Sequence, residues 1–184
     1  MESPRTRALQ AAVELLGTEG LRSLTHARVD DRAGLPKGST SNYFRSRAAL
    51  MSGVVDWLAE ADRQAAGPGG FRPATAAEFV DAMCGLFDLI TRVNRVQTTA
   101  RLILFLEGSH DPVLREALSR GHAALKAGAA EALAALGATD PEVAAHTMAA
   151  VSEGLILHRI ARHDDVDPRP TFELIARAVI PVAG

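Results

Sequence analysis

The sequence has very little cysteine and no long uninterrupted apolar run. Cys84 is the only cysteine among 184 residues, so an intramolecular disulfide and a cysteine-rich zinc site are both excluded. The first ten residues lack the charged-then-apolar layout of a signal peptide, and no run reaches the roughly 18 apolar residues that a membrane span needs. These absences predict a cytoplasmic protein with no membrane partner, and nothing in the pattern indicates a metal or another cofactor.

Aromatic residues are also scarce. They make up 4% of the chain, whereas apolar residues of all kinds make up 47%. Alanine is abundant, and few stretches alternate β-branched or aromatic residues with polar ones, so close-packed helices are favoured over a sheet. We therefore predict an all-α fold, with one large domain or a small domain joined to a larger one.

Charge is distributed unevenly along the chain. The first 50 residues contain eight Lys or Arg and five Asp or Glu, whereas the whole chain has a net charge of −2. A basic N-terminal segment on an acidic body is what a polyanion-binding head needs. Uneven surface charge without functional meaning explains the counts equally well.

Capping and helix-breaking residues divide the chain into two series of helices. Ser3-Pro4 reads as the start of a helix, Thr25 and Ser46 read as further N-caps, and residues 65–74 read as a linker. In the second series, Thr75 and Glu78 form a capping box, and two Asp-Pro pairs open long helices. The expected helices cover residues 4–18, 25–34, 37–44, 46–64, 75–93, 95–108, 111–136, 141–163 and 171–180.

Two short expected helices on either side of Gly34 have the helix-turn-helix arrangement. In that motif the second helix enters the major groove of DNA with its N-terminal residues leading. Lys37 can reach a guanine edge or a phosphate, and Asn42 can donate hydrogen bonds to phosphates or bases. The alternative is an ordinary helical hairpin, in which Tyr43 and Phe44 are core residues and the hydroxyl groups are solvated.

The segment LTHARVDDRAGLPKGSTSNYFRSRAAL, residues 24–50, resembles the DNA-binding signature of the TetR family of transcriptional regulators. The matching positions are Leu24, Thr25, Val29, Ala33, Gly34, Lys37, Gly38, Tyr43, Phe44, Arg47 and Leu50. The resemblance implies a helix-turn-helix DNA-binding domain at residues 1–46, made of three helices plus a connecting fourth at about 47–64. It also implies a C-terminal helical bundle for ligand binding and dimerisation within residues 47–184.

The same resemblance assigns residues to the DNA contact. It implies that Lys37, Gly38, Ser39 and Ser41 face bases and that Thr25, Asn42, Tyr43 and Arg47 hold the DNA backbone. The chain departs from the family pattern at several positions. The family commonly has alanine where Asp30 stands and a large apolar residue where Thr40 stands. An aromatic residue or histidine is frequent at 41 or 42, and lysine is usual at 47.

The C-terminal bundle is expected to bind an unknown, largely apolar small molecule. The candidate pocket residues are Met83, Phe87, Phe105, Leu106 and Met148. Plain core packing is the alternative for each of them, because apolar residues at helical spacing usually form a core. By similarity, the last two helices form the surface through which two subunits pair.

The function expected from the resemblance is a ligand-responsive repressor that binds a palindromic double-stranded DNA operator as a homodimer and is released by a small molecule. The alternative is a helical ligand-binding or scaffold protein that no longer binds DNA, which would tolerate Asp30 and Asp31 in a basic segment. An enzyme is not expected, because the sequence contains no nucleophile elbow, no phosphate-binding glycine-rich loop and no His-Glu-x-x-His motif.

Overall fold

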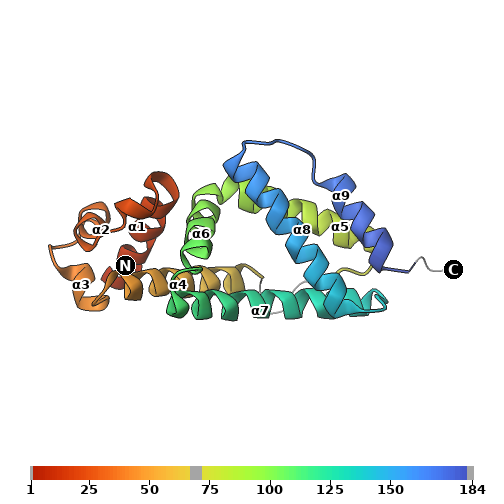
Figure 1. The fold of residues 1–184 in the computed structure, drawn as a ribbon, viewed down its shortest axis with the longest axis horizontal. Coiled ribbons are helices and arrows are strands. Elements are labelled where there is room, and N and C mark those ends of the chain that lie inside the picture. Colours follow the sequence, from red (N-terminus) through yellow and green to blue (C-terminus); the bar gives the residue numbers. More distant parts are fainter. Residues whose placement is uncertain (1, 67–71, 182–184) are drawn as a thin grey trace. The chain divides into compact units, whose positions relative to one another are not determined.

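The computed structural model describes residues 2–66 and 72–181, and every regular element in these ranges is a helix (Figure 1). This confirms the all-α prediction. The described residues form two compact units. The described residues within 1–65 and 95–121 form the N-terminal unit, and those within 66–94 and 122–184 form the C-terminal unit. Within the described ranges, no helix is both long and apolar enough to cross a membrane.

The N-terminal unit begins with four helices in the order that the sequence predicts. They are α1 (Pro4–Glu19), α2 (His26–Ala33), α3 (Ser39–Tyr43) and α4 (Arg47–Ala66), with a 3₁₀ turn at Leu21–Ser23. The predicted caps are confirmed, since Ser3 Oγ accepts from Thr6 N at 3.1 Å and Ser46 Oγ accepts from Ala49 N at 3.1 Å. Local side-chain chemistry therefore sets where these helices start.

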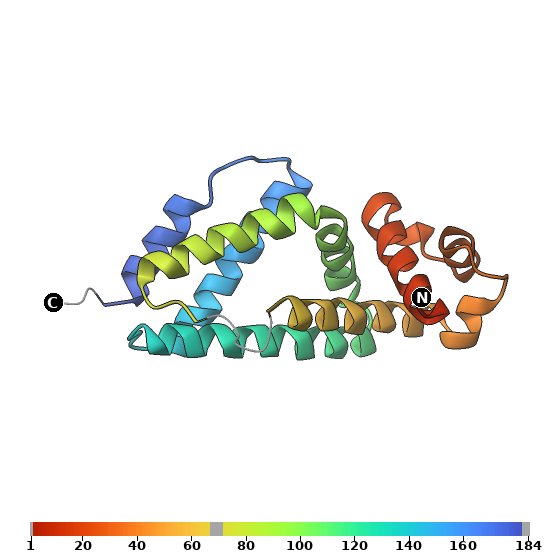
Figure 2. The same ribbon diagram turned by 180° about the vertical axis from the view of Figure 1, so that it is seen from behind.

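Helix α6 (Arg95–Glu107) and the first part of α7 (Pro112–Ala135) complete the N-terminal unit. Helix α6 packs directly on α1 at Gly17 (Figures 1 and 2). A Cβ atom on Gly17 would lie 2.2 Å from the carbonyl oxygen of Val96, so this helix crossing requires glycine. The core beneath it includes Leu9, Leu16, Leu50 and Leu104, all buried.

The C-terminal unit is built from α5 (Ala76–Asp88), the second part of α7, α8 (Pro141–Ala161) and α9 (Arg169–Val179). Helices α5 and α9 lie side by side (Figures 1 and 2). The rings of Phe87 and Phe172 meet edge to face there, with their centroids 6.4 Å apart. Phe79, Leu133 and Met148 are buried in the same core.

One stretch of the C-terminal unit differs from the sequence prediction. A continuous helix is expected to run to about residue 93, but α5 ends at Asp88 and a π-helical turn covers Leu89–Val93. The Thr91 hydroxyl donates to the carbonyl oxygen of Phe87 at 2.6 Å inside this turn. A side-chain hydroxyl that bonds to the preceding turn competes with the backbone ladder, which accounts for the local change of winding.

Candidate nucleic-acid interface

Helix α2 is fixed at both of its ends. At the N-terminus, Thr25 Oγ1 accepts from Arg28 N at 3.3 Å, which makes Thr25 the predicted cap. At the C-terminus, Gly34 takes the left-handed conformation at φ 61°, and the Arg7 guanidinium donates to the carbonyl oxygens of Ala33 and Gly34. These contacts satisfy carbonyls that a helix end leaves free, and they hold the turn that leads to α3.

Helix α3 presents a small polar surface. Lys37, Gly38, Ser41, Asn42 and Tyr43 are exposed. The Ser39 side chain is half-buried, and its hydroxyl donates to the Pro36 carbonyl oxygen at 2.6 Å. Gly38 has φ 87°, a backbone conformation that favours glycine, and a Cβ there would meet nothing within 4 Å.

The two aromatic residues at the end of α3 take different environments. Tyr43 keeps 46% of its surface exposed, whereas Phe44 is buried with 5% exposed. The Arg5 guanidinium lies 5.4 Å from the Phe44 ring centroid, and a Cβ on Gly53 would come within 2.5 Å of Phe44 Cε1. The hairpin alternative placed both aromatics in the core; that placement holds for Phe44 and is wrong for Tyr43.

Asp30 makes the most hydrogen-bonded contact between α2 and the start of α3, and the sequence analysis did not predict this contact. It is 3% exposed, and its carboxylate accepts from Gly38 N at 2.7 Å, from Thr40 N at 2.8 Å and from Thr40 Oγ1 at 2.5 Å. Thr40 itself is fully buried. Asp30 and Thr40 both depart from the family pattern, and this paired departure is the signal that could have revealed their contact.

These hydrogen bonds outweigh the cost of burying the charge. Burial alone raises the pKa of the Asp30 carboxyl, but the bonds from the Thr40 hydroxyl and from the N–H groups of Thr40 and Gly38 leave the pKa below its ordinary value. The nearby His26 ring is a smaller cause that acts in the same direction. Asp30 is therefore an ionised acid in the folded protein at neutral pH.

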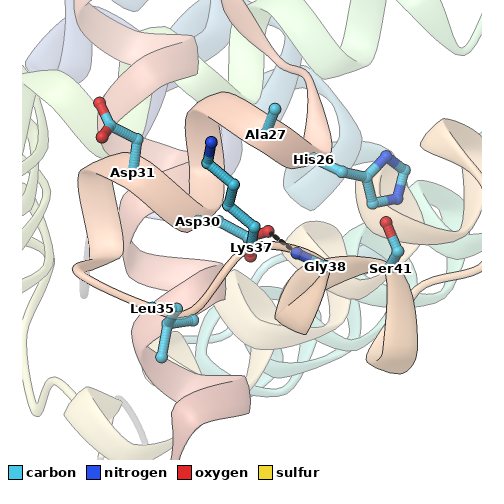
Figure 3. Close-up of a pocket in the computed structure, with 8 residues that line it drawn as sticks. All are labelled: His26, Ala27, Asp30, Asp31, Leu35, Lys37, Gly38 and Ser41. Carbon is cyan, nitrogen blue, oxygen red and sulfur yellow. Dashed lines mark hydrogen bonds between the residues drawn. The ribbon is translucent and has the colours of Figure 1, made fainter.

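A recess of about 540 Å³ opens between α2 and α3. It is lined by His26, Ala27, Asp30, Asp31, Leu35, Lys37, Gly38 and Ser41. Figure 3 shows these residues and the hydrogen bond from Gly38 to Asp30, with the Asp31 carboxylate pointing away from that bond. Ring nitrogen Nε2 of His26 lies 2.7 Å from the Phe44 carbonyl oxygen.

Several cations of this unit already have protein partners. The Arg47 guanidinium, expected to hold the DNA backbone, donates to the carbonyl oxygen of Leu21 at 2.5 Å and remains exposed. Arg28 and Arg32 both pair with Glu19, and the hydrogen bond from Arg32 is the largest cause that lowers the pKa of that carboxyl. The positive charge of the segment is thus partly neutralised within the unit.

The predicted pocket residues belong to both units. Phe87 and Met148 are buried in the core of the C-terminal unit, and Met83 is half-buried against the same core. Phe105 and Leu106 lie on α6 in the N-terminal unit, with 60% and 67% of their surfaces exposed. The structure therefore brings together three of the five candidates and places the other two in a different unit.

A buried arginine is the most unusual polar feature of the C-terminal unit. Arg159 is 6% exposed, stacks over the Phe87 ring at 4.9 Å and donates to the Val166 carbonyl oxygen at 2.7 Å. Its Nη1 lies 3.0 Å from Asp165 Oδ1 and 3.9 Å from Asp88 Oδ1. Yet Nε and Nη1 have no aligned hydrogen-bond acceptor in the described ranges. A hollow of about 90 Å³ adjoins this side chain.

The remaining polar and thiol side chains take ordinary structural roles. Arg101 on α6 pairs with Asp62 at 2.7 Å. Burial raises the pKa of the Cys84 thiol, which lowers its thiolate fraction and its reactivity. No group of three His, Cys, Asp or Glu side chains in residues 2–66 and 72–181 is arranged to hold a metal ion.

Comparison with known protein families covers most of the chain. Residues 8–54 match the model of bacterial regulatory proteins of the tetR family, and residues 74–182 match the tetracyclin repressor-like C-terminal domain. No curated protein sequence is significantly similar to the chain.

Solved structures share the fold at low sequence identity. A transcriptional regulator from Rhodococcus sp. Rha1 is 19% identical with a TM-score of 0.81, and the match covers 100% of both chains. The multidrug binding protein EbrR, complexed with ethidium, is 22% identical with a TM-score of 0.77, covering 98% of this chain and 100% of that one. A TetR-family member from Streptomyces coelicolor A3 is 21% identical with a TM-score of 0.73, at the same coverage. Because both family models match, and the C-terminal model alone covers more than half of the chain, this chain belongs to the TetR family and is a DNA-binding transcriptional regulator.

Proposed function

We propose that the protein is a cytoplasmic repressor that binds a palindromic operator as a homodimer and is released from it by a small, largely apolar molecule. The observation that carries this proposal is the exposed polar surface of α3, where small side chains leave the backbone open to close approach. A repressor needs only to occupy its operator, whereas an activator must also contact the polymerase.

The proposed contacts divide between bases and backbone. Lys37, Gly38, Ser39 and Ser41 are proposed to read base edges, because they lie on or just before the N-terminal turn of α3. The proposed backbone contacts come from Thr25, Asn42, Tyr43 and Arg47. All eight residues lie within the stretch 25–47, which the tetR-family model also covers.

Exposed apolar residues support pairing through the last two helices. Leu157 on α8 and Leu174 on α9 are 45% and 63% exposed, whereas Ile160 is buried in the unit's own core. These exposed apolar side chains are available for a second subunit to cover. Sedimentation of the full chain should give twice the monomer mass, and Leu174→Glu should shift it toward monomer. A wild-type monomer at micromolar concentration would contradict the homodimer.

The effector site is proposed among Met83, Phe87 and Met148 in the C-terminal unit. Phe105 and Leu106, on α6 of the N-terminal unit, stay predicted ligand contacts within that unit. Met side chains suit pockets that accept different ligands. EbrR, which shares the fold, is a multidrug binding protein complexed with ethidium. Because α6 packs on α1 at Gly17, a ligand that moves α6 would also act on the DNA-binding helices.

We also propose a functional boundary near residue 46, with DNA binding before it and ligand binding and dimerisation after it. The linker at 65–74 in this scheme lies partly outside the described residues, because the structure describes nothing from 67 to 71. Helices α4 and α6 pack with the DNA-binding helices, so they are the natural elements to connect the two functions.

DNA selected from a random-sequence pool tests this function directly. The full chain should enrich a palindromic duplex and shift it in a gel at low salt. Ser41→Ala should relax the sequence preference, whereas Tyr43→Phe should weaken all duplexes alike. If a folded dimer shifts no duplex at low salt, the scaffold alternative replaces the regulator.

A transcription assay separates repression from activation. The selected duplex is placed across a promoter, and transcripts are counted with and without the protein. Fewer transcripts with protein support repression. More transcripts would show that the protein activates.

A further inference from the structure

Helix α2 contacts helix α3 at both of its ends through two side chains one helical turn apart. Asp30 accepts from the N–H groups of Gly38 and Thr40 at the N-terminal end of α3. His26 Nε2 lies 2.7 Å from the carbonyl oxygen of Phe44, the residue that caps the C-terminal end. Residues four apart on a helix share one face, so this single face of α2 holds the whole of α3.

Helix α3 is too short to hold its own orientation. It runs only from Ser39 to Tyr43, and isolated helices shorter than about 12 residues are marginal in water. Its direction must therefore come from contacts made with the rest of the unit. Apolar contact alone fixes direction loosely, whereas hydrogen bonds with defined geometry fix both distance and angle.

The contact between Asp30 and Thr40 is well suited to fix direction. Both residues are almost fully buried, so water does not compete for these bonds. The carboxylate accepts three bonds at once, two of them from the N–H groups of Gly38 and Thr40 at the start of α3. Bonds to a charged acceptor are shorter and stronger than those between neutral groups.

We propose that His26, Asp30, Thr40 and the Phe44 carbonyl form a polar clasp that sets the angle at which α3 meets DNA. Asp30 is the positioning residue of this clasp. It acts on base reading through Gly38 and Thr40 and does not itself need to touch DNA. The proposal rests on the DNA-binding function described above.

The charge of Asp30 makes the proposal unusually testable. An acid close to a DNA-binding surface repels phosphates, so removing its charge should strengthen binding to every duplex if repulsion is its main effect. If Asp30 instead positions α3, removing its charge should weaken binding to the preferred duplex. The two roles therefore predict changes of opposite sign.

The experiment compares two probes for each full-length variant, by fluorescence anisotropy at fixed pH and salt. One probe is the duplex that the wild-type protein selects from a random pool, and the other is a scrambled duplex of equal length and composition. Asp30→Asn should lose about tenfold or more of the affinity ratio between the probes, because an amide cannot accept all three bonds. Thr40→Val, which removes only the hydroxyl group, should lower this affinity ratio about threefold.

Two controls separate positioning from charge and from stability. Asp31→Asn removes the neighbouring exposed charge and should bind both probes as tightly as wild type or more tightly. Leu104→Ala removes a buried side chain on α6 and should lower stability while keeping the ratio between the probes. A clasp that acted only through stability would reduce the ratio in Leu104→Ala as well.

The outcomes are distinct. Folded Asp30→Asn with a wild-type or higher ratio overturns the clasp while leaving DNA binding intact. If Asp30→Asn does not fold, Thr40→Val decides, and a ratio within about twofold of wild type overturns the clasp. If the wild-type protein selects no sequence at all, the DNA-binding function fails and the clasp fails with it.

Discussion

Asp30 in the N-terminal unit and Arg159 in the C-terminal unit are both charged and both buried, yet their hydrogen bonding is opposite. The Asp30 carboxylate receives three bonds from a neighbouring element. The Arg159 guanidinium donates to Val166 O and forms an ion pair with Asp165 at 3.0 Å, but its Nε and Nη1 lack aligned hydrogen-bond acceptors among the described residues. The buried charge of the N-terminal unit therefore has a full set of hydrogen-bond partners, whereas the buried charge of the C-terminal unit has only part of one.

This difference shows how firmly each unit fixes the geometry around its buried charge. A buried polar group with every bond satisfied fixes one geometry, because any movement costs several bonds at once. A partly satisfied group costs stability and holds its surroundings less firmly. The N-terminal unit carries a recognition surface that must keep its shape. The C-terminal unit is the one in which the proposed effector acts, and looser bonding there is compatible with a change of packing.

The largest effect on the free energy of unfolding is expected for Asp30, the buried charge that has all of its hydrogen-bond partners. Asp30→Ala should lower the free energy of unfolding by about 2–4 kcal/mol, because it removes buried volume and takes the acceptor away from three donors, two of them buried on Thr40. Urea denaturation followed by circular dichroism measures this loss.

Asp31→Ala is the matched control, since Asp31 is exposed on the same helix. Its free energy of unfolding should stay within about 0.5 kcal/mol of wild type. If Asp30→Ala loses less than about 1 kcal/mol, similar to the control, the buried Asp30 carboxylate contributes little to stability. The contrast with Arg159 would then not hold.

The pH dependence of stability gives a second, smaller effect. The folded protein holds the pKa of Asp30 below the ordinary aspartate value of about 3.9. As the pH falls, the unfolded chain takes up the proton first, so the stabilising contribution is present above that value and is lost below it. The difference in free energy of unfolding between wild type and Asp30→Asn should therefore be constant near neutral pH and shrink from about pH 5 downward.

Using Asp30→Asn as the reference cancels other acids. Glu19 also has a lowered pKa, but it is present in both proteins and makes no contact with Asp30 among those described. Urea denaturation between pH 7 and pH 3 measures the difference. A gap that stays constant across this range would show that the Asp30 charge is not what the hydrogen bonds stabilise.

Local signals explain what the sequence could predict. Helix starts at Ser3, Thr75 and Asp140 were predicted correctly, because each cap bonds to a backbone N–H three residues away. The all-α class followed from composition in the same way. Features that depend on contacts between distant residues were not predictable by this route. The π-helical turn at Leu89–Val93 and the burial of Asp30 both belong to this class.

The candidate sites show the same limit. The exposed row on α3 could be predicted, because the matched family signature assigns inward and outward positions. The exposure of Phe105 and Leu106 could not, since an apolar run such as that of α6 does not reveal which face is covered. Arg159 lies among apolar residues of α8, and its partners Val166 and Asp165 come from the segment after the helix. Only the fold brings them together.

The smallest effect on the free energy of unfolding is expected for Arg159, the buried charge with an incomplete set of hydrogen-bond partners. Arg159→Met should leave the free energy of unfolding within about 1 kcal/mol of wild type or slightly above it, because methionine fills similar space over Phe87 without burying a charge. Arg159→Ala is the volume control and should lose about 2 kcal/mol through lost packing over the ring. A loss above about 3 kcal/mol for Arg159→Met is the size expected for breaking a well-compensated buried pair. Asp165 and Asp88 would then satisfy the guanidinium as fully as Thr40 and Gly38 satisfy Asp30, and the two units would not differ.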